Sequence, residues 1–196
     1  MNETRNRIVT ATSELFRRRG FNGTSLKDVS IAAEAPTGSI YHFFPGGKDE
    51  LAEAVIEASG AAYQQLFELI ADAAASSGHA ITDFFEGAAE VLRTTDYIDA
   101  CPIGTVAREV ASTNERLRSA TDRVFDSWLE AATARFERAG LARVDAEELA
   151  VTVVAALEGG FLLTRTARDP ERLRTIGRQI RVLFDDAVER AHAVRS

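Results

Sequence analysis

Residues 25–51 constrain the fold more than any other stretch, because they place two short helix signals on either side of a tight turn. Ser25-Leu26-Lys27-Asp28 fits a capping box, with Asp at the position that Glu usually fills. Pro36 suits the start of a second short helix, and Pro45-Gly46-Gly47 ends it. The spacing predicts a helix-turn-helix.

The second of these helices, Thr37–Phe44, is rich in side chains that form hydrogen bonds and are usually exposed. Ile40 and Phe44 lie four residues apart and can anchor the helix inward, so Tyr41 and His42 point elsewhere. A polar helix in so compact a frame suits the major groove of DNA.

The charge is divided unevenly along the chain. The net charge is −7, but residues 1–50 carry a net charge of +1 and residues 51–196 carry −8. The acidity belongs to the C-terminal part, which leaves room for a small DNA-binding head. The hydrophobic fraction of 45% is that of an ordinary soluble globular protein. With neither a signal peptide nor an apolar run long enough to span a membrane, we expect a cytoplasmic location.

Outside this motif the hydrophobic pattern is helical throughout. Residues 4–19 carry an amphipathic stripe that ends at Gly20, a typical helix stop. Similar stripes predict further helices at 48–75, 80–93, 101–110, 114–138, 145–168 and from 169 onward. Capping signals include Asn114, Asp145 and Asp169-Pro170. The pattern favours an all-α fold of about nine helices, without a convincing strand.

Several residues between 4 and 55 recur at the fixed spacing of a known family. They are the Gly20-Phe21 helix end, Thr24-Ser25, the buried face Leu26/Val29/Ala32, Gly38-Ser39-Ile40-Tyr41, and Phe44-Pro45 followed by Lys48 and Leu51. This pattern resembles the DNA-binding domain of the tetracycline-repressor (TetR) family of transcriptional regulators. The string AP-x-GSIYHFFPGGK resembles the branch of small multidrug-type repressors related to LmrA and YxaF.

The resemblance implies a ligand-responsive regulator: a homodimeric repressor that binds a palindromic operator in double-stranded DNA and is released by a small-molecule effector. It implies a helix-turn-helix DNA-binding domain at residues 1–50 and a helical effector-binding and dimerisation domain at residues 51–196. The implied DNA contacts are Thr24, Ser25, Lys27, Thr37, Gly38, Ser39, Tyr41, His42 and Lys48. Two of these residues have an alternative interpretation. Ser25 can serve as a helix cap without contacting DNA, and Tyr41 can cover the rim of the core.

Three positions depart from the family pattern. Glu34 stands where Gly is usual, Phe43 where His or Tyr is frequent, and Thr37 where a basic residue is common. Phe43 cannot bond a phosphate, and Glu34 strains a left-handed backbone or reshapes the turn. These changes suggest fewer phosphate contacts and a weaker or more salt-limited DNA affinity. A dimeric ligand carrier that does not bind DNA therefore remains an alternative function.

The middle helices carry apolar and aromatic residues that suit a pocket for a lipophilic effector. The candidates are Phe67, Phe84, Phe85, Val91, Cys101, Ile103, Thr105, Phe125, Trp128 and Phe161. The alternative is that such a stripe is plain core. Cys101 is the chain's single cysteine, which excludes an intramolecular disulfide. Its place at a helix N-terminus permits a redox-responsive repressor, and a buried inert thiol is the alternative.

The last two helices are the expected dimer interface, since family members pair through two C-terminal helices. Two Gly in one helix cost about 1 kcal/mol each relative to Ala, which points to a packing role, although an internal kink is the alternative. The expected interface residues are Ala155, Ala156, Gly159, Gly160, Leu162, Ile176, Ile180, Leu183 and Phe184.

An enzyme is the competing class, and the sequence gives it no support. Glu109, Glu115 and Glu158 have no His partner in sequence, and neither a Gly-rich phosphate loop nor a nucleophile elbow is found. His79 and His192 lie outside any ligand-like spacing from His42. We therefore expect no catalytic residue, no metal and no cofactor.

Overall fold

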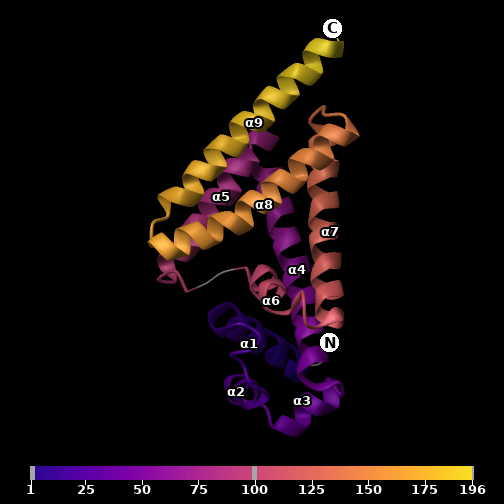
Figure 1. Ribbon diagram of the computed structural model, residues 1–196, viewed down its shortest axis with the longest axis vertical. Coiled ribbons are helices and arrows are strands. Elements are labelled where there is room, and N and C mark those ends of the chain that lie inside the picture. Colours follow the sequence, from indigo (N-terminus) through magenta and orange to yellow (C-terminus); the bar gives the residue numbers. More distant parts are fainter. Residues whose placement is uncertain (1–2, 99–100, 196) are drawn as a thin grey trace. The chain divides into compact units, whose positions relative to one another are not determined.

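The computed structural model describes residues 3–98 and 101–195, and these residues contain nine α-helices and no strand (Figure 1). The predicted all-α class is confirmed. The helices are α1 (Glu3–Arg19), α2 (Leu26–Ala32), α3 (Thr37–Phe43), α4 (Gly47–Ala73), α5 (Ser77–Thr94), α6 (Pro102–Val110), α7 (Glu115–Arg138), α8 (Arg143–Ala167) and α9 (Glu171–Arg195).

The chain forms two compact units. One takes Met1–Ala62 with Ala100–Phe125, and the other takes Tyr63–Asp99 with Asp126–Ser196. The expected domain boundary after residue 50 falls inside α4, so the division into domains at that point stays a prediction.

In the first unit, α1, α2 and α3 pack around large apolar side chains. Ile8, Phe16, Val29 and Ile40 are all buried. The predicted capping box is confirmed, because the Asp28 N–H donates to Ser25 Oγ at 3.1 Å and the Ser25 N–H donates to Asp28 Oδ2 at 2.9 Å. Two orphan amides at the start of α2 are thereby satisfied.

The rest of the first unit joins α4 to α7 through polar contacts beside a buried apolar seam. Glu53 accepts from Arg116 Nε at 2.6 Å and from Arg123 at 3.0 Å. Asn114 caps α7 as predicted, since its Oδ1 accepts from the Leu117 N–H at 3.1 Å. The Asn114 side-chain amide also donates to Asp49 at 2.9 Å.

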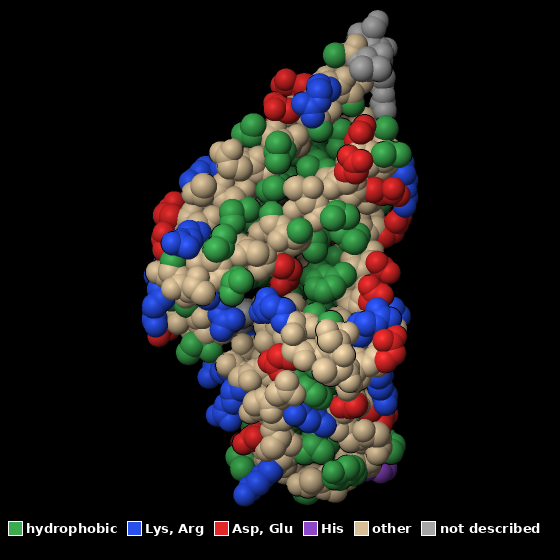
Figure 2. Space-filling model, in the orientation of Figure 1, with side chains coloured by type: hydrophobic (Ala, Val, Ile, Leu, Met, Phe, Trp, Pro, Cys, Tyr) green, Lys and Arg blue, Asp and Glu red, His purple; other side chains and the backbone are tan. Residues whose placement is uncertain are grey.

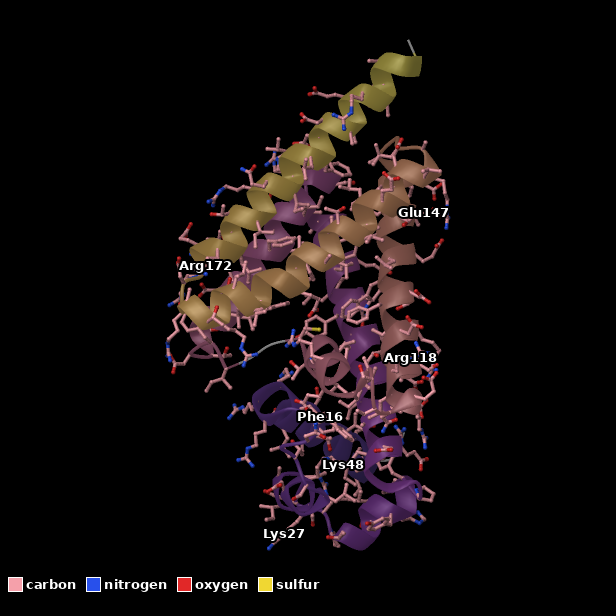
Figure 3. The ribbon with its side chains drawn as sticks, viewed as in Figure 1. Phe16, Lys27, Lys48, Arg118, Glu147 and Arg172 are labelled. Carbon is pink, nitrogen blue, oxygen red and sulfur yellow. The ribbon has the colours of Figure 1, made fainter. Side chains whose placement is uncertain are left out.

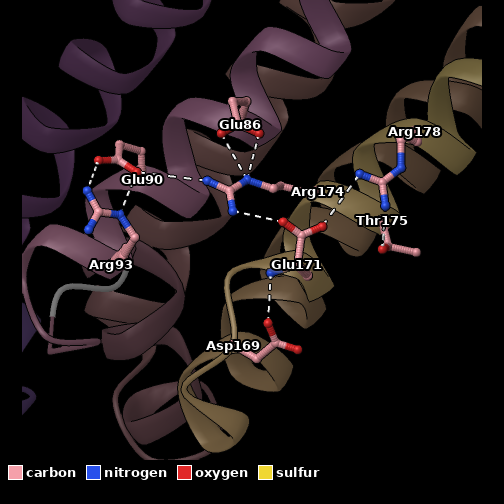
Figure 4. Close-up of polar contacts among 8 residues, drawn as sticks. All are labelled: Glu86, Glu90, Arg93, Asp169, Glu171, Arg174, Thr175 and Arg178. Atoms are coloured by element: carbon pink, nitrogen blue, oxygen red, sulfur yellow. Dashed lines mark hydrogen bonds and ion pairs between the residues drawn. The ribbon is translucent and has the colours of Figure 1, made fainter.

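In the second unit, α5 packs against α8 and α9. Arg174 of α9 lies at the centre of a polar cluster on the outside of this packing (Figure 4). Its Nε donates to both carboxylate oxygens of Glu86, at 2.9 and 2.8 Å, and its Nη1 donates to Glu171 at 2.9 Å. Glu90 completes the cluster at 3.9 Å. One arginine thus ties α5 to the start of α9.

Three local expectations were wrong. The helix expected from Ala80 begins at Ser77, because Ser76 caps it by accepting from the His79 N–H at 3.3 Å. Asp145 does not cap α8, which begins at Arg143 without a side-chain cap. Ala32, expected on the buried face of α2, is exposed.

Among the described residues, every helix is too short or too polar to cross a bilayer.

Candidate nucleic-acid interface and associated sites

The seven residues of α3 divide into an anchored side and an outward side. Ile40 is fully buried, and Phe44, just beyond the helix, is 1% exposed. These two side chains therefore anchor α3 to the rest of the first unit. Tyr41 is 52% exposed, and Thr37 and His42 are exposed as well. The predicted orientation is therefore confirmed. Gly38 is also exposed, and Ser39 is half-buried.

The polar side chains at the start of α2 already form hydrogen bonds within the chain. The Ser25 hydroxyl donates to Asp28 at 2.5 Å, and its bonds hold the pKa of the Asp28 carboxyl below its usual range. Thr24 is 2% exposed, and its hydroxyl donates to the Gly20 carbonyl at 2.8 Å. Lys27, by contrast, extends outward from α2 (Figure 3). Lys27 is therefore better placed than Thr24 to contact a phosphate.

Lys48, in the first turn of α4, lies against the end of α1. Its ammonium is 4.2 Å from the centroid of the Phe21 ring. Burial lowers the pKa of Lys48, and the nearby charges of Asp49 and Glu109 oppose that shift. The side chain is half-buried in this arrangement.

The turn between α2 and α3 is left-handed at Glu34, where φ is 50°. We expected Glu34 either to strain a left-handed backbone or to reshape the turn, and its backbone is left-handed. Such a conformation costs about 1–2 kcal/mol for a residue with a Cβ. The turn is held by Ser30, whose hydroxyl donates to the Ala35 carbonyl at 2.6 Å, and by the Ala35 N–H, which donates to the Ser30 carbonyl at 3.1 Å.

Basic side chains gather over α1 and α2, as Figure 2 shows in blue. A further basic residue, missed in the sequence, is Arg5: its guanidinium lies 5.2 Å from the centroid of the Phe44 ring, which places it beside the end of α3. The signal that could have found it is a basic residue in the first turn of a helix that packs on the recognition helix.

A groove of about 530 Å³ lies between α4 and α7 of the second unit. Of the ten expected effector residues, only Phe67 lines it, and Phe67 also meets Phe84 edge to face at 5.6 Å. Charged side chains dominate the remaining lining: Glu68, Asp72, Glu130, Arg135 and Arg138. Arg135 occupies part of the groove, donating to Asp72 and to the Ala71 carbonyl near the end of α4.

The other effector candidates are spread over both units. In the second unit Phe85 and Phe161 are buried, Trp128 lies 6.1 Å from Tyr63 between ring centroids, and Val91 is 49% exposed. Val91 is on the outward side because Ile81, Phe85, Ala89 and Leu92 form the buried stripe of α5. A lining role for Val91 is therefore not supported by its position.

In the first unit, Ile103 and Cys101 are buried, and Phe125 is half-buried. The Thr105 hydroxyl oxygen is buried and lacks a hydrogen-bond partner within the described chain. Cys101 is the N-cap of α6, and its sulfur accepts from the Gly104 N–H at 3.4 Å. α6 thus combines apolar side chains with one unsatisfied hydroxyl, which suits a ligand with a polar handle.

The expected dimer residues fall into two sets. Ala155, Gly159, Leu162 and Leu183 are exposed, and Figure 2 shows green apolar side chains along this side of α8 and α9. Other large apolar residues exposed on the same two helices are Val144, Val151, Leu163 and Val182. A groove of about 480 Å³, lined in part by Leu149, Thr152 and Leu183, lies between α8 and α9.

The second set lies at or within the packing of the chain itself. A Cβ added to Gly160 would come within 2.7 Å of Leu173, so the close approach that Gly160 permits is between α8 and α9 of one chain. Ile180 and Phe184 are buried, and Phe184 packs on Phe136 at 5.1 Å between centroids. Ala156 and Ile176 are half-buried.

Comparison with family models gives two matches. Residues 8–55 match the bacterial regulatory proteins of the tetR family, and residues 77–179 match the C-terminal domain of LmrA/YxaF-like transcriptional regulators. The HTH-type transcriptional regulator YxaF of Bacillus subtilis is 33% identical over 92% of this chain and 95% of its own. LmrA of the same organism is 32% identical over 85% of this chain and 89% of its own.

Solved structures share the fold at lower identity. A TetR regulatory protein from Rhodobacter sphaeroides gives a TM-score of 0.82 at 21% identity, covering 92% of this chain and 98% of its own. A TetR transcriptional regulator from Legionella pneumophila gives 0.81 at 24% identity, covering 92% and 96%.

Proposed function

Because this chain belongs to the tetR family of bacterial transcriptional regulators, in its LmrA/YxaF-like group, we propose that it is a homodimeric repressor of a palindromic operator, released by a small lipophilic effector. The family consists of regulators rather than enzymes. The observation that carries the proposal is the divided character of α3, with Ile40 buried and Tyr41 and His42 turned outward.

The proposed DNA contacts are the outward groups of α3 and the basic residues that flank it. Thr37, Gly38, Ser39, Tyr41 and His42 would read base edges and phosphates in the major groove. Ser25, Lys27, Lys48 and Arg5 would bind phosphates. We leave Thr24 out of this set because its side chain is buried, whereas Ser25, whose hydroxyl is also engaged, is exposed. A regulator of this kind would act in the cytoplasm, where the bacterial chromosome lies.

The exposed apolar side of α8 and α9 supports the proposed dimerisation. An exposed apolar face that includes Val151, Ala155, Leu162 and Leu183 would be costly in water and is typical of an interaction surface. Two copies related by a two-fold axis would bury it and present two recognition helices to successive major grooves, about 34–36 Å apart or a multiple of that. A palindromic operator matches this symmetry.

The effector is proposed to bind beside α6. Ile103 and Cys101 supply apolar surface, and the Thr105 hydroxyl supplies a buried group that a ligand can satisfy. A ligand that favours one conformation of the dimer lowers DNA affinity only by the difference in its binding free energy between the two conformations.

The experiment that tests the proposal is a fluorescence-anisotropy titration of the protein with DNA from its own upstream region. It is run at several salt concentrations with unrelated DNA as competitor. Binding that resists the competitor supports the repressor, and release from that DNA then identifies effectors. Binding no tighter than to random DNA would contradict the proposal and favour the ligand carrier, to which Glu34, Thr37 and Phe43 also point.

A redox-responsive repressor is the second candidate, because the Cys101 sulfur sits at the N-terminus of α6 and accepts an amide hydrogen bond. The helix dipole favours a thiolate there. Hydrogen peroxide should then release wild-type protein from its operator but not a Cys101→Ser variant. Equal release of both, or of neither, would remove this candidate.

A further inference from the structure

The loop between α1 and α2 is held by a side chain from α6. The Asn22 N–H donates to Glu109 Oε2 at 2.7 Å, across 87 positions of sequence. Charge-assisted hydrogen bonds from an amide to a carboxylate are stronger than those between neutral groups.

Gly20 makes room for the same carboxylate. A Cβ built on Gly20 would lie 1.7 Å from Glu109 Oε1, and Gly20 has a φ of +73°. The glycine therefore ends α1 and also leaves the space that Glu109 fills. On the neighbouring residue, the Phe21 ring lies under the Lys48 ammonium of α4. Side chains of α4 and α6 thus hold two successive residues of one loop.

This loop leads directly into the capping box that starts α2. A tether at Asn22 therefore limits where α2, and α3 after it, can lie relative to α6. α6 also carries Ile103 and Thr105, which belong to the proposed effector site.

We propose that Glu109 is a positioning residue for DNA binding: its carboxylate ties the start of the helix-turn-helix to α6, so that a displacement of α6 reaches α2 and α3 through this contact. The inference rests on the proposed function, and it names the contact through which the effector site would control DNA binding.

The first test compares Glu109→Ala with Glu115→Ala in the full chain, by anisotropy with the operator DNA. Each substitution removes one carboxylate, and Glu115 serves as the control because it bonds Arg118 within α7. Loss of negative charge alone would tighten DNA binding in both variants. We expect Glu109→Ala instead to weaken operator binding by at least about fivefold relative to Glu115→Ala. Glu109→Gln, which keeps an acceptor oxygen, should recover part of the loss.

Hydrogen exchange gives a second readout. The Asn22 amide should exchange at least about tenfold faster in Glu109→Ala, while amides in the middle of α1 keep their wild-type rates. Gly20→Ala should displace the same carboxylate, so its effect on operator affinity should be smaller in the Glu109→Ala background than in wild type. This double-mutant cycle also serves if either single variant folds less well.

Wild-type binding to the operator with equal affinities in Glu109→Ala and Glu115→Ala would overturn the inference and leave the proposed function intact. An unchanged Asn22 exchange rate, or strictly additive effects of Gly20→Ala and Glu109→Ala, would overturn it as well. Absence of specific DNA binding by the wild-type protein would instead contradict the proposed function, and the inference with it.

Discussion

The Lys48 ammonium lies over the Phe21 ring, 4.2 Å from its centroid. A cation over an aromatic face gains about 0.5–1 kcal/mol at an exposed site. To bind a phosphate, Lys48 must keep this contact or exchange it for a stronger one. The contact also holds α4 to the end of α1, so the proposed phosphate group is part of the packing of the DNA-binding helices.

Lys48→Met should weaken binding to all DNA sequences alike and reduce the salt slope of the affinity by about 1, because one phosphate contact is lost without any change in base readout. Anisotropy titrations over a range of salt concentrations measure both quantities. Arg143→Met, in α8, is the control for overall charge. A loss confined to the operator sequence would show that Lys48 acts on base recognition instead.

Tyr41→Ala should weaken specific operator binding by about 1–3 kcal/mol and leave the dimer and its melting temperature unchanged, since Tyr41 is 52% exposed. Competition anisotropy with operator and random DNA measures the change. Tyr41→Phe separates the hydroxyl from the ring. Operator affinity equal to wild type in Tyr41→Ala would remove this residue from the interface.

Glu34→Gly should raise the free energy of unfolding by about 0.5–1 kcal/mol. The left-handed backbone at Glu34 costs about 1–2 kcal/mol with a side chain, and the greater freedom of Gly in the unfolded chain offsets part of that gain. Urea denaturation monitored by circular dichroism measures it. Glu34→Ala, which keeps the Cβ, is the control and should gain nothing. A lower free energy of unfolding in Glu34→Gly would mean that the Glu34 side chain stabilises the fold by more than its left-handed backbone costs.

Part of the pH dependence of the free energy of unfolding should come from the ionisation of Glu53. Hydrogen bonds from Arg116 and then Arg123 lower the pKa of Glu53, and burial opposes them. Because the folded pKa lies below the unfolded value of about 4.3, the contribution is fully present above that pH and is lost as the pH falls through the folded pKa.

Glu53→Gln should therefore lower stability at pH 7 by up to about 1 kcal/mol, and the difference from wild type should shrink as the pH falls below about 4.3. Urea denaturation at several pH values measures it. Glu57→Gln is the matched control, because Glu57 is more exposed than Glu53 and, among the described residues, pairs with Arg123 alone. A difference that is constant from pH 7 to pH 3 would exclude the ionised pair as its cause.

Leu162→Arg should convert the proposed dimer to monomer, since it places a charge in the middle of the exposed apolar side of α8. Sedimentation velocity measures the oligomeric state. Leu69→Arg is the control, because Leu69 is an equally apolar residue, 62% exposed, on α4. A dimer that survives Leu162→Arg and is lost in Leu69→Arg would move the interface to α4.

Most patterns that depend on neighbours in sequence were predictable, although the cap at Ser76, the missing cap at Asp145 and the exposure of Ala32 were not. Contacts between residues far apart in sequence were not predictable. Local spacing predicts the capping box at Ser25, the end of α1 at Gly20 and the outward orientation of the Tyr41 side chain. Thr24 is a local exception, because its hydroxyl donates to the Gly20 carbonyl only four residues earlier and the residue type alone does not reveal that bond. Gly160 looked like an interface residue because a helical glycine signals close approach without naming the partner, which is Leu173 of the same chain. Glu109 carried no motif at all, since its partner amide lies 87 residues away.

The cluster around Arg174 implies an unequal tolerance to mutation. Glu86, Glu90 and Glu171 all share that one guanidinium, so each acid can be replaced while Arg174 still has carboxylate partners. Replacement of Arg174 itself would leave the three acids close together with their shared counter-charge gone, although Arg93 still pairs with Glu90 and Arg178 with Glu171. Related chains are therefore expected to vary at the three acidic positions one at a time, and to change the arginine only when an acid changes with it.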